Sequence, residues 1–557
     1  MSTGIDPITK SVIEHRLTSI IGQMGEAMLR TTYSQILNAS RDFSIAICDA
    51  TGRLVAQADH LPVHVGALPW AATAVEERFG ADLKPGDVVL LNDPAFGGSH
   101  LPDITAFVPV FHEGKRLLWT IVRAHVSDIG GATHGGYNPT AREIWQEGLR
   151  IPPIRLHESG RLRDDLLDLI ALNVRNGDDF RGDVAAMVGA AHFGERRLNE
   201  LLGEFGTGIV ERAINELLDA AEQQACATVS EWKDGVFVGE ALLEDDGHGR
   251  KDIRIVAKVT VSCGSVEVDL SDSDPQTVSF VNSSHANMQA AVTMAYAYLL
   301  DPETPKNSGS FRPLKVVARP GTIVWADAHL PVSFCTSHPS NEIVEAVIKA
   351  LAFSCPERAM AGWSRRFRIA IQGEDPRNGR RFIWHLAHAR PGGGASSSGD
   401  GWSSVGEWHT AGGAKFGSVE VAEARFPLFF RKHEFRPGSG GAGQFRGGLG
   451  VHLQLLLETE KPALANTAGE GARFGGCGLF GGEDGAPHDY VHVTNAGERR
   501  RLATKAAGIE IAPRDLLDIA SSGGGGWGDP RMRTAQEIAS DLKNEVIAQD
   551  ISTEDWR

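Results

Sequence analysis

Two histidines and an aspartate within residues 92–131 have the types and spacing to bind a metal ion: His100, Asp103 and His125. After Asp103 the chain reads ITAFVPVF, then a polar HEGKR, then LLWTIVRAHV, a pattern that predicts a β-hairpin. With Gly114 at the centre of the turn, Asp103 lies opposite His125. Opposed residues share a face of the sheet with Cβ atoms about 5 Å apart. Both side chains could then reach one ion at about 2.0 to 2.2 Å.

His100 must reach the same ion from a turn and not from a helix. Pro102 biases the residue before it away from the helical region, so we expect Gly97 and Gly98 to fold the imidazole back. A one-residue slip of the hairpin register would turn His125 to the other face. Alternatively, the segment is an edge hairpin whose histidines and aspartate are simply exposed.

Two imidazoles and one carboxylate leave coordination positions open, which is typical of a catalytic metal site and not of a closed structural one. Zinc and manganese are the metals we expect, and iron(II) also fits. The same ligands as an iron(II) facial triad for oxygen chemistry are an alternative. Asp128 follows His125 by three residues. It is predicted to act catalytically at the same site, by approaching the metal or by orienting a ligand imidazole.

Five motifs are spread over nearly the whole chain. They are SRDFSIAICDATGRLVAQ (40–57), GDVVLLNDPAFGGSHLPDI (86–104), RAHVSDIGG (123–131), RPGSGGAGQFRGGLG (436–450) and GGGGWGDP (523–530). Together and in this order they resemble the hydantoinase B/oxoprolinase family. That family comprises the B-type subunits of ATP-dependent lactam hydrolases and of related ketone carboxylases.

The resemblance implies that His100, Asp103 and His125 bind a divalent metal. It also implies that Asp42, in the SRDFS motif, acts at that site as a further ligand or as a general base on water. An A-type partner subunit would use ATP to activate the substrate. This B-type chain would then complete ring opening of a small cyclic amide, which is a hydantoin, an oxoproline or a lactam, within a hetero-oligomer.

Two alternative functions stay open beside this one. The chain could be the metal-binding subunit of an ATP-dependent ketone carboxylase, or a non-catalytic scaffold subunit. No G-x-x-x-x-G-K-[ST] motif occurs in the sequence, which agrees with ATP being used by the partner.

The composition narrows the class of partner. The 55 Lys and Arg against 71 Asp and Glu give a net charge of −16, which argues against nucleic acid or an anionic membrane as a partner. No apolar run approaches the length of a membrane span, and the N-terminus lacks the apolar core of a signal peptide. We therefore expect a cytoplasmic protein.

The spacing of apolar residues predicts an α+β protein of several units, rich in antiparallel hairpins, with a helical segment in the middle and a glycine-rich, β-rich C-terminal part. Glycine-rich loops let backbone approach backbone or ligand closely, and a flexible linker is the alternative that we favour for residues 391–401. The predicted units are an N-terminal helix with a metal-binding β-rich unit (1–158), a helical segment (159–231), an α+β unit (232–365), a glycine-rich β-rich unit (366–530) and a C-terminal helical tail (531–557).

Overall fold

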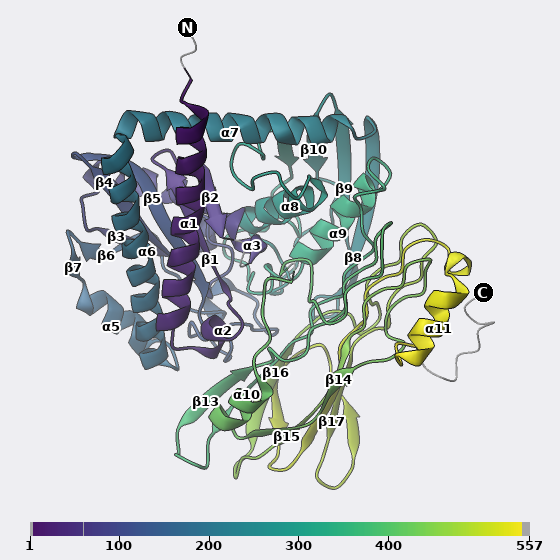
Figure 1. The fold of residues 1–557 in the computed structure, drawn as a ribbon. Helices are drawn as coiled ribbons and strands as arrows, with labels where there is room; N and C mark the ends of the chain where they lie inside the picture. The colour runs from purple at the N-terminus through teal and green to yellow at the C-terminus, as the bar shows by residue number, and fades with distance from the viewer. Residues whose placement is uncertain (1–3, 59–60, 411, 548–557) are drawn as a thin grey trace.

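The computed structural model describes residues 4–58, 61–410 and 412–547. It confirms the predicted α+β class, because helices alternate along the chain with mostly antiparallel sheets and a helical segment lies in the middle (Figure 1). The last ten residues of the predicted tail lie outside the described part. Within the described ranges, no helix is both long and apolar enough to cross a membrane.

A seven-stranded sheet forms the centre of the N-terminal part and contains the predicted hairpin. Each strand is antiparallel to its neighbours. In spatial order the strands are β2 (Leu54–Ala58), β1 (Phe43–Asp49), β5 (Lys115–His125), β4 (Asp103–His112), β3 (Val88–Leu91), β6 (Ile154–Glu158) and β7 (Arg161–Leu162). The central strands are buried on both faces, so both faces need a helical cover.

Two long helices, α1 (Pro7–Thr31) and α6 (Gly177–Phe205), pack against each other and cover one face of this sheet. The other face packs against α4 (Leu68–Phe79). Asp6 caps α1 and Pro7 opens it, as the Asp-Pro pair favours. The shorter helices of this part are α2 (Gln35–Asn38), α3 (Pro62–Val65) and α5 (Asp164–Leu172).

Helix α7 (Thr207–Ser230) runs along the top of the view in Figure 1, from the N-terminal sheet to a second sheet. That sheet has the order β11-β10-β9-β8, and β10 and β11 are its parallel pair. Helices α8 (His285–Leu299) and α9 (Ser340–Leu351) pack beside it. Its strands are β8 (Gly235–Asp245), β9 (Lys251–Ser262), β10 (Ser265–Asp269) and β11 (Leu314–Val317).

The C-terminal part contains two further sheets with one apolar core between them. The first consists of β13 (Arg381–His385), β12 (Ile369–Glu374), β16 (Ala463–Ala468) and β19 (Lys505–Ile511). The second consists of β14 (Leu428–Phe435), β15 (Val451–Leu457), β20 (Leu516–Ala520), β17 (Asp489–Val493) and β18 (Arg499–Arg501). The helices are α10 (Val419–Arg425) and α11 (Ala535–Lys543).

The glycine-rich stretches of the C-terminal part pack backbone against backbone. Residues 391–401 lie against the stretches 438–450 and 523–528 and exchange hydrogen bonds with both. A Cβ added to Gly524 would lie 1.9 Å from the carbonyl oxygen of Gly393, so no side chain fits there. The expectation of a flexible linker at 391–401 is therefore wrong, because these glycines permit close packing and do not loosen the chain.

Candidate functional site

Strands β4 and β5 place Asp103 opposite His125, in the register that the sequence predicts. This register depends on a bulge. The two-residue turn at Gly114 (φ +80°) alone would give a ladder in which Asp103 faces Ala124. Leu117 has no partner in the ladder and adds one residue to β5. The bulge therefore keeps His125 on the same face of the sheet as Asp103.

His100 lies in the turn that leads into β4. A Cβ on Gly98 would lie 2.0 Å from the carbonyl oxygen of Asn92, so only glycine lets the chain fold back this tightly. The Asn92 side chain donates a hydrogen bond of 2.7 Å to the carbonyl of Leu101. These contacts hold the imidazole of His100 over the start of the hairpin.

The three predicted ligands converge on one point. His100 Nε2 lies 2.9 Å from Asp103 Oδ1 and 3.1 Å from His125 Nδ1, and His125 Nδ1 lies 3.1 Å from Asp103 Oδ1. The three residues are at most 2% exposed. Within the described residues they are the one group of His, Cys, Asp or Glu side chains whose donor atoms are close enough to hold a metal ion.

Hydrogen bonds outside the triad orient its donor atoms. His100 Nδ1 lies 2.5 Å from the carbonyl oxygen of Ser333. A proton on Nδ1 leaves the Nε2 lone pair free for a ligand. Ser99 Oγ donates to Asp103 Oδ2, which turns Oδ1 toward the imidazoles. Glu147 accepts hydrogen bonds from the backbone amides of Val332 and Ser333, so the residue that orients His100 is itself fixed.

The electrostatics of His125 and Asp103 favour ligation at neutral pH, whereas an ion at His100 Nε2 would have to displace a proton. Burial alone would lower the pKa of His100, but the charge of Asp103 and the hydrogen bond to it raise that pKa. Burial lowers the pKa of His125 to about 4, which leaves its ring neutral. Burial alone would raise the pKa of Asp103. The charges of His100 and His64 and the hydrogen bonds from the two ring nitrogens outweigh burial and lower that pKa well below its usual value. A buried carboxylate beside neutral imidazole is the donor set that divalent transition metals take, so these residues fit such an ion.

Asp42 comes to the same site from a third strand. It immediately precedes β1, which pairs with β5, and the His125 backbone donates a 3.0 Å hydrogen bond to the Asp42 carbonyl. His64 lies between two carboxylates, with Nε2 3.7 Å from Asp42 Oδ1 and 3.5 Å from Asp103 Oδ2. Ser44 Oγ lies 3.3 Å from the other ring nitrogen of His64. Burial raises the pKa of Asp42.

Asp128 has different neighbours. Its Oδ1 accepts a 2.9 Å hydrogen bond from the guanidinium of Arg175. Its Oδ2 accepts backbone hydrogen bonds from Gly130 and Arg175. In the described part of the chain no hydrogen bond or ion pair joins Asp128 to the triad. The structure therefore brings Asp42 to the predicted metal site and binds Asp128 to the segment before α6.

A small cavity of about 30 Å³ opens beside His125 and Asp42. Its far wall comes from the C-terminal half of the chain: Arg366, Arg368, His385, Arg390 and His409. Sequence reasoning missed these residues. The segment RRFRI (365–369) was a usable sign, because three arginines enter an apolar strand and buried arginines need a reason.

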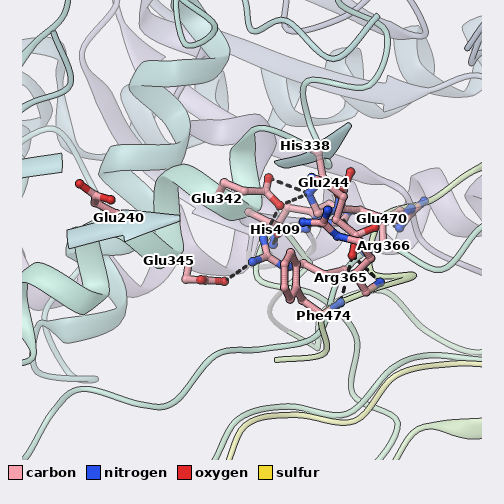
Figure 2. A network of polar contacts seen from close by, with 12 residues as sticks. Glu240, Glu244, His338, Glu342, Glu345, Arg365, Arg366, His409, Glu470 and Phe474 are labelled. Atoms are coloured by element: carbon pink, nitrogen blue, oxygen red, sulfur yellow. Dashed lines mark hydrogen bonds and ion pairs between the residues drawn. The ribbon is translucent and has the colours of Figure 1, made fainter. Parts of the chain in front are cut away.

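A buried polar network holds this wall in place (Figure 2). Glu342 on α9 accepts hydrogen bonds from His338 and Arg365. The other ring nitrogen of His338 accepts a 3.1 Å hydrogen bond from the Arg366 backbone. The Arg366 carbonyl in turn accepts one of 3.0 Å from the backbone amide of Glu470. Arg365 and Arg366 thus face opposite sides, with Arg365 in the network and Arg366 at the cavity.

A buried His/Asp/His triad on an antiparallel sheet, closed by a cationic wall from the second half of the chain, defines an α+β protein with a candidate metal centre. A model of the hydantoinase B/oxoprolinase family matches residues 6–530. The chain belongs to this family.

Comparison with individual proteins agrees with this family assignment. The chain is 34% identical over 554 residues to the caprolactamase subunit beta of Pseudomonas jessenii, covering 98% of this chain and 95% of the relative. It superposes on the crystal structure of ATP-dependent caprolactamase from Pseudomonas jessenii with a TM-score of 0.91 at 31% identity, covering 98% and 95% of the two chains. A nucleotide-free acetone carboxylase structure matches with a TM-score of 0.89 at 18% identity, covering 98% and 78%, which shows a shared fold alone.

Proposed function

We propose that this chain is the metal-binding subunit of an ATP-dependent cyclic amide hydrolase, and that an ATP-binding partner activates the substrate. The observation that carries the proposal is the convergence of His100 Nε2, Asp103 Oδ1 and His125 Nδ1 beside Asp42 in a buried cavity. The likeness to a caprolactamase subunit over nearly the full length of both chains supports this reaction class.

The reaction must overcome two barriers, because amide resonance weakens the carbonyl as an electrophile and water is a poor nucleophile. A divalent ion held by the triad would supply Lewis acidity against either barrier. Asp42 is placed to accept the proton of the attacking water, since its carboxylate lines the cavity beside His125. His64 Nε2, between Asp42 and Asp103, keeps the Asp42 carboxylate directed toward the triad.

In this proposal Asp128 has a structural role and does not contact the substrate. Through Arg175 it ties the segment after β5 to the start of α6. This contact positions the end of the hairpin that bears His125. The catalytic role that the sequence suggests for Asp128 stays a prediction, and its exchange is compared with that of Asp42 below.

The first test is the metal content of the purified chain, measured by elemental analysis after supply of zinc, manganese or iron(II). We expect near-stoichiometric metal in the native chain and its loss in His100→Ala and in His125→Ala, because two ligands are too few to hold the ion. His112→Ala is the matched control, since His112 lies at the far end of β4 and contacts Asn199. A native chain without metal would contradict the proposal.

The second arm of this test is activity with an ATP-binding partner subunit. ATP-dependent opening of lactams, hydantoins or oxoproline is expected with the native chain and with His112→Ala, but not with the two ligand variants. Incorporation of bicarbonate into a ketone, with no ring opening, would instead identify a carboxylase. Full ring opening by His100→Ala would leave this chain as a scaffold.

A further inference from the structure

Three arginines line the cavity next to the triad, and each is more than nine-tenths buried: Arg366, Arg368 and Arg390. Arg366 and Arg368 lie on the segment that enters β12, and Arg390 follows β13. A buried guanidinium is costly unless an opposite charge and hydrogen bonds compensate it. Three buried guanidinium groups around one small cavity therefore require compensating negative charge.

The described residues supply two carboxylates for these three guanidinium groups. Among the described residues, Glu407 is the one carboxylate with an oxygen within 4 Å of any of the three, at 3.5 Å from Arg366 and 3.9 Å from Arg390. Asp42 lines the same cavity, and its longer-range negative charge partly offsets the burial of all three. Arg368 instead donates to the Gly135 carbonyl at 3.1 Å and lies over the ring of Tyr137 at 4.3 Å. Along the described chain, Arg368 thus makes no ion pair.

Two nitrogens of this wall also lack partners. Arg366 Nε and Arg390 Nε are buried and find no hydrogen-bond partner in the described part of the chain. Burial lowers the pKa of Arg368 to about 10 and also lowers that of Arg390, whereas at Arg366 the charge of Glu407 outweighs burial and raises the pKa. The wall therefore offers both positive charge and unused donors to a ligand.

The arginines are held from behind, so they do not collapse onto one another. The Arg366 backbone is fixed through His338 and Glu470 in the network of Figure 2. The Arg390 carbonyl accepts hydrogen bonds from the hydroxyls of Ser404 and Ser521. Such support behind the contact residues is typical of a preorganised binding site.

We propose that Arg366, Arg368 and Arg390 form a binding site for a phosphate-type dianion beside the metal triad. Guanidinium groups bind phosphate oxygens through paired hydrogen bonds, and the three of them outnumber the two carboxylates near them, Glu407 and Asp42. The ligand is either free phosphate or a phosphoryl group on a larger molecule. Only its assignment to an activated substrate rests on the proposed function.

Entry of such a ligand requires movement of the cavity wall. A volume of about 30 Å³ holds only about two water molecules. Ile36 and His385 line both this cavity and a neighbouring open pocket of about 520 Å³. The neighbouring pocket is thus the side from which the dianion reaches the arginines.

The test is isothermal titration of the purified full-length chain, metal-loaded and metal-free, with inorganic phosphate, methyl phosphate and acetate. We expect one phosphate per chain in both forms and much weaker binding of acetate. Arg368→Gln and Arg390→Gln should each weaken phosphate binding by at least about tenfold. Arg254→Gln is the matched control, because Arg254 is half exposed on β9 and pairs with Glu240. Stronger binding of methyl phosphate than of phosphate would identify the phosphoryl group of a larger molecule.

Absence of phosphate binding, or binding that both variants retain unchanged, would overturn the proposal. Arg368→Lys keeps the charge but loses the paired donors, and it serves if the Gln variant does not fold. Phosphate binding without any ring-opening activity would contradict the proposed function and leave the anion site standing. ATP-dependent ring opening by a chain that binds no phosphate would support the proposed function and contradict the anion site.

Discussion

Asp42 and Asp128 are both acids beside the metal-site hairpin, but their oxygens meet different partners. Asp42 lines the cavity and lies near His64, whereas both oxygens of Asp128 are taken by Arg175 and backbone amides. The chemical type of the two residues is the same. Only their surroundings differ: the Asp42 carboxylate faces a cavity and can contact a substrate, whereas the Asp128 carboxylate connects two segments of the chain.

Replacement of Asp42 by Asn should lower kcat with the partner subunit by about 10²- to 10⁴-fold, the usual contribution of a general base. The metal content should stay near that of the native chain, because the triad is untouched. Steady-state kinetics and elemental analysis on one preparation measure both effects. Full activity of Asp42→Asn would contradict the assigned role, and loss of metal would make Asp42 a ligand instead.

Replacement of Asp128 by Asn should act on stability. Arg175 would lose its partner, at a cost of about 2 to 4 kcal/mol in the free energy of unfolding. Thermal and denaturant unfolding measure this cost. A stable Asp128→Asn chain that keeps its metal but loses activity would instead restore the predicted catalytic role.

Sequence reasoning predicted the proximity of the three candidate ligands because they lie within 26 consecutive residues, on one hairpin and the turn before it. Local periodicity and turn chemistry are readable over such a distance. The cationic wall is different. Its arginines lie near His125 only because distant parts of the chain pack together: Arg366, Arg368 and Arg390. A single sequence does not predict such long-range contacts.

At the scale of elements, the sequence predicted the correct pairing of Asp103 with His125 but not the bulge that produces this pairing. A turn centred on Gly114 and a two-residue turn followed by a bulge at Leu117 give the same pairing at Asp103. The bulge itself is not readable from alternation, because both faces of β5 are buried. Both accounts place His125 beside Asp103, and only the structure distinguishes them.

The turn before β4 offers a test of how the elements position the ligands. In Gly98→Ala the new Cβ would meet the backbone of Asn92, so the turn must open and His100 must move. We expect metal binding at least about tenfold weaker, with the overall fold kept. Gly189→Ala on α6 is the control, because nothing lies within 4 Å of its Cβ and alanine favours helix. Undiminished metal affinity in Gly98→Ala would show that the turn does not set the position of His100.

At the scale of the whole molecule, one ion-pair network attaches the last helix to the glycine-rich stretches. Arg533 contacts Asp400 at 2.8 and 2.9 Å and Asp541 at 2.7 Å, and Arg446 contacts Asp541 at 3.1 Å. Asp541 lies on α11, and Asp400 lies in the packed stretch 391–401. The side chain of Arg533 is 2% exposed, so a lost partner there is not replaced by water.

We expect acid to weaken the attachment of α11 to the glycine-rich stretches and so to release the helix. Burial alone would raise the pKa of Asp400, but the hydrogen bond from Arg533 and the charges of Arg446 and Arg533 lower it below 3.8. Because the folded pKa lies below the unfolded one, the stabilisation is complete above about pH 4 and disappears as the pH falls through the folded pKa. Hydrogen exchange of α11 should therefore accelerate in acid.

Asp400→Asn should produce the same release at neutral pH, at a cost of about 1 to 3 kcal/mol in the opening free energy of α11. Asp529→Asn is the control, since Asp529 forms a pair with Arg531 on the surface and such pairs contribute little. Equal exchange rates for α11 in the two variants would contradict the anchoring role of Asp400.

The separation of the ligands from their cover along the chain has a consequence for biosynthesis. The donors belong to residues 100–125, whereas Ser333, Arg366 and His409 follow about 200 to 300 residues later. A ribosome adds about 5 to 20 residues per second, so a nascent hairpin stays uncovered for about 10 to 60 seconds. An ion captured in that interval would be enclosed when the C-terminal half folds over it. The metal carried by the finished protein would then reflect the supply during translation more than equilibrium exchange afterwards.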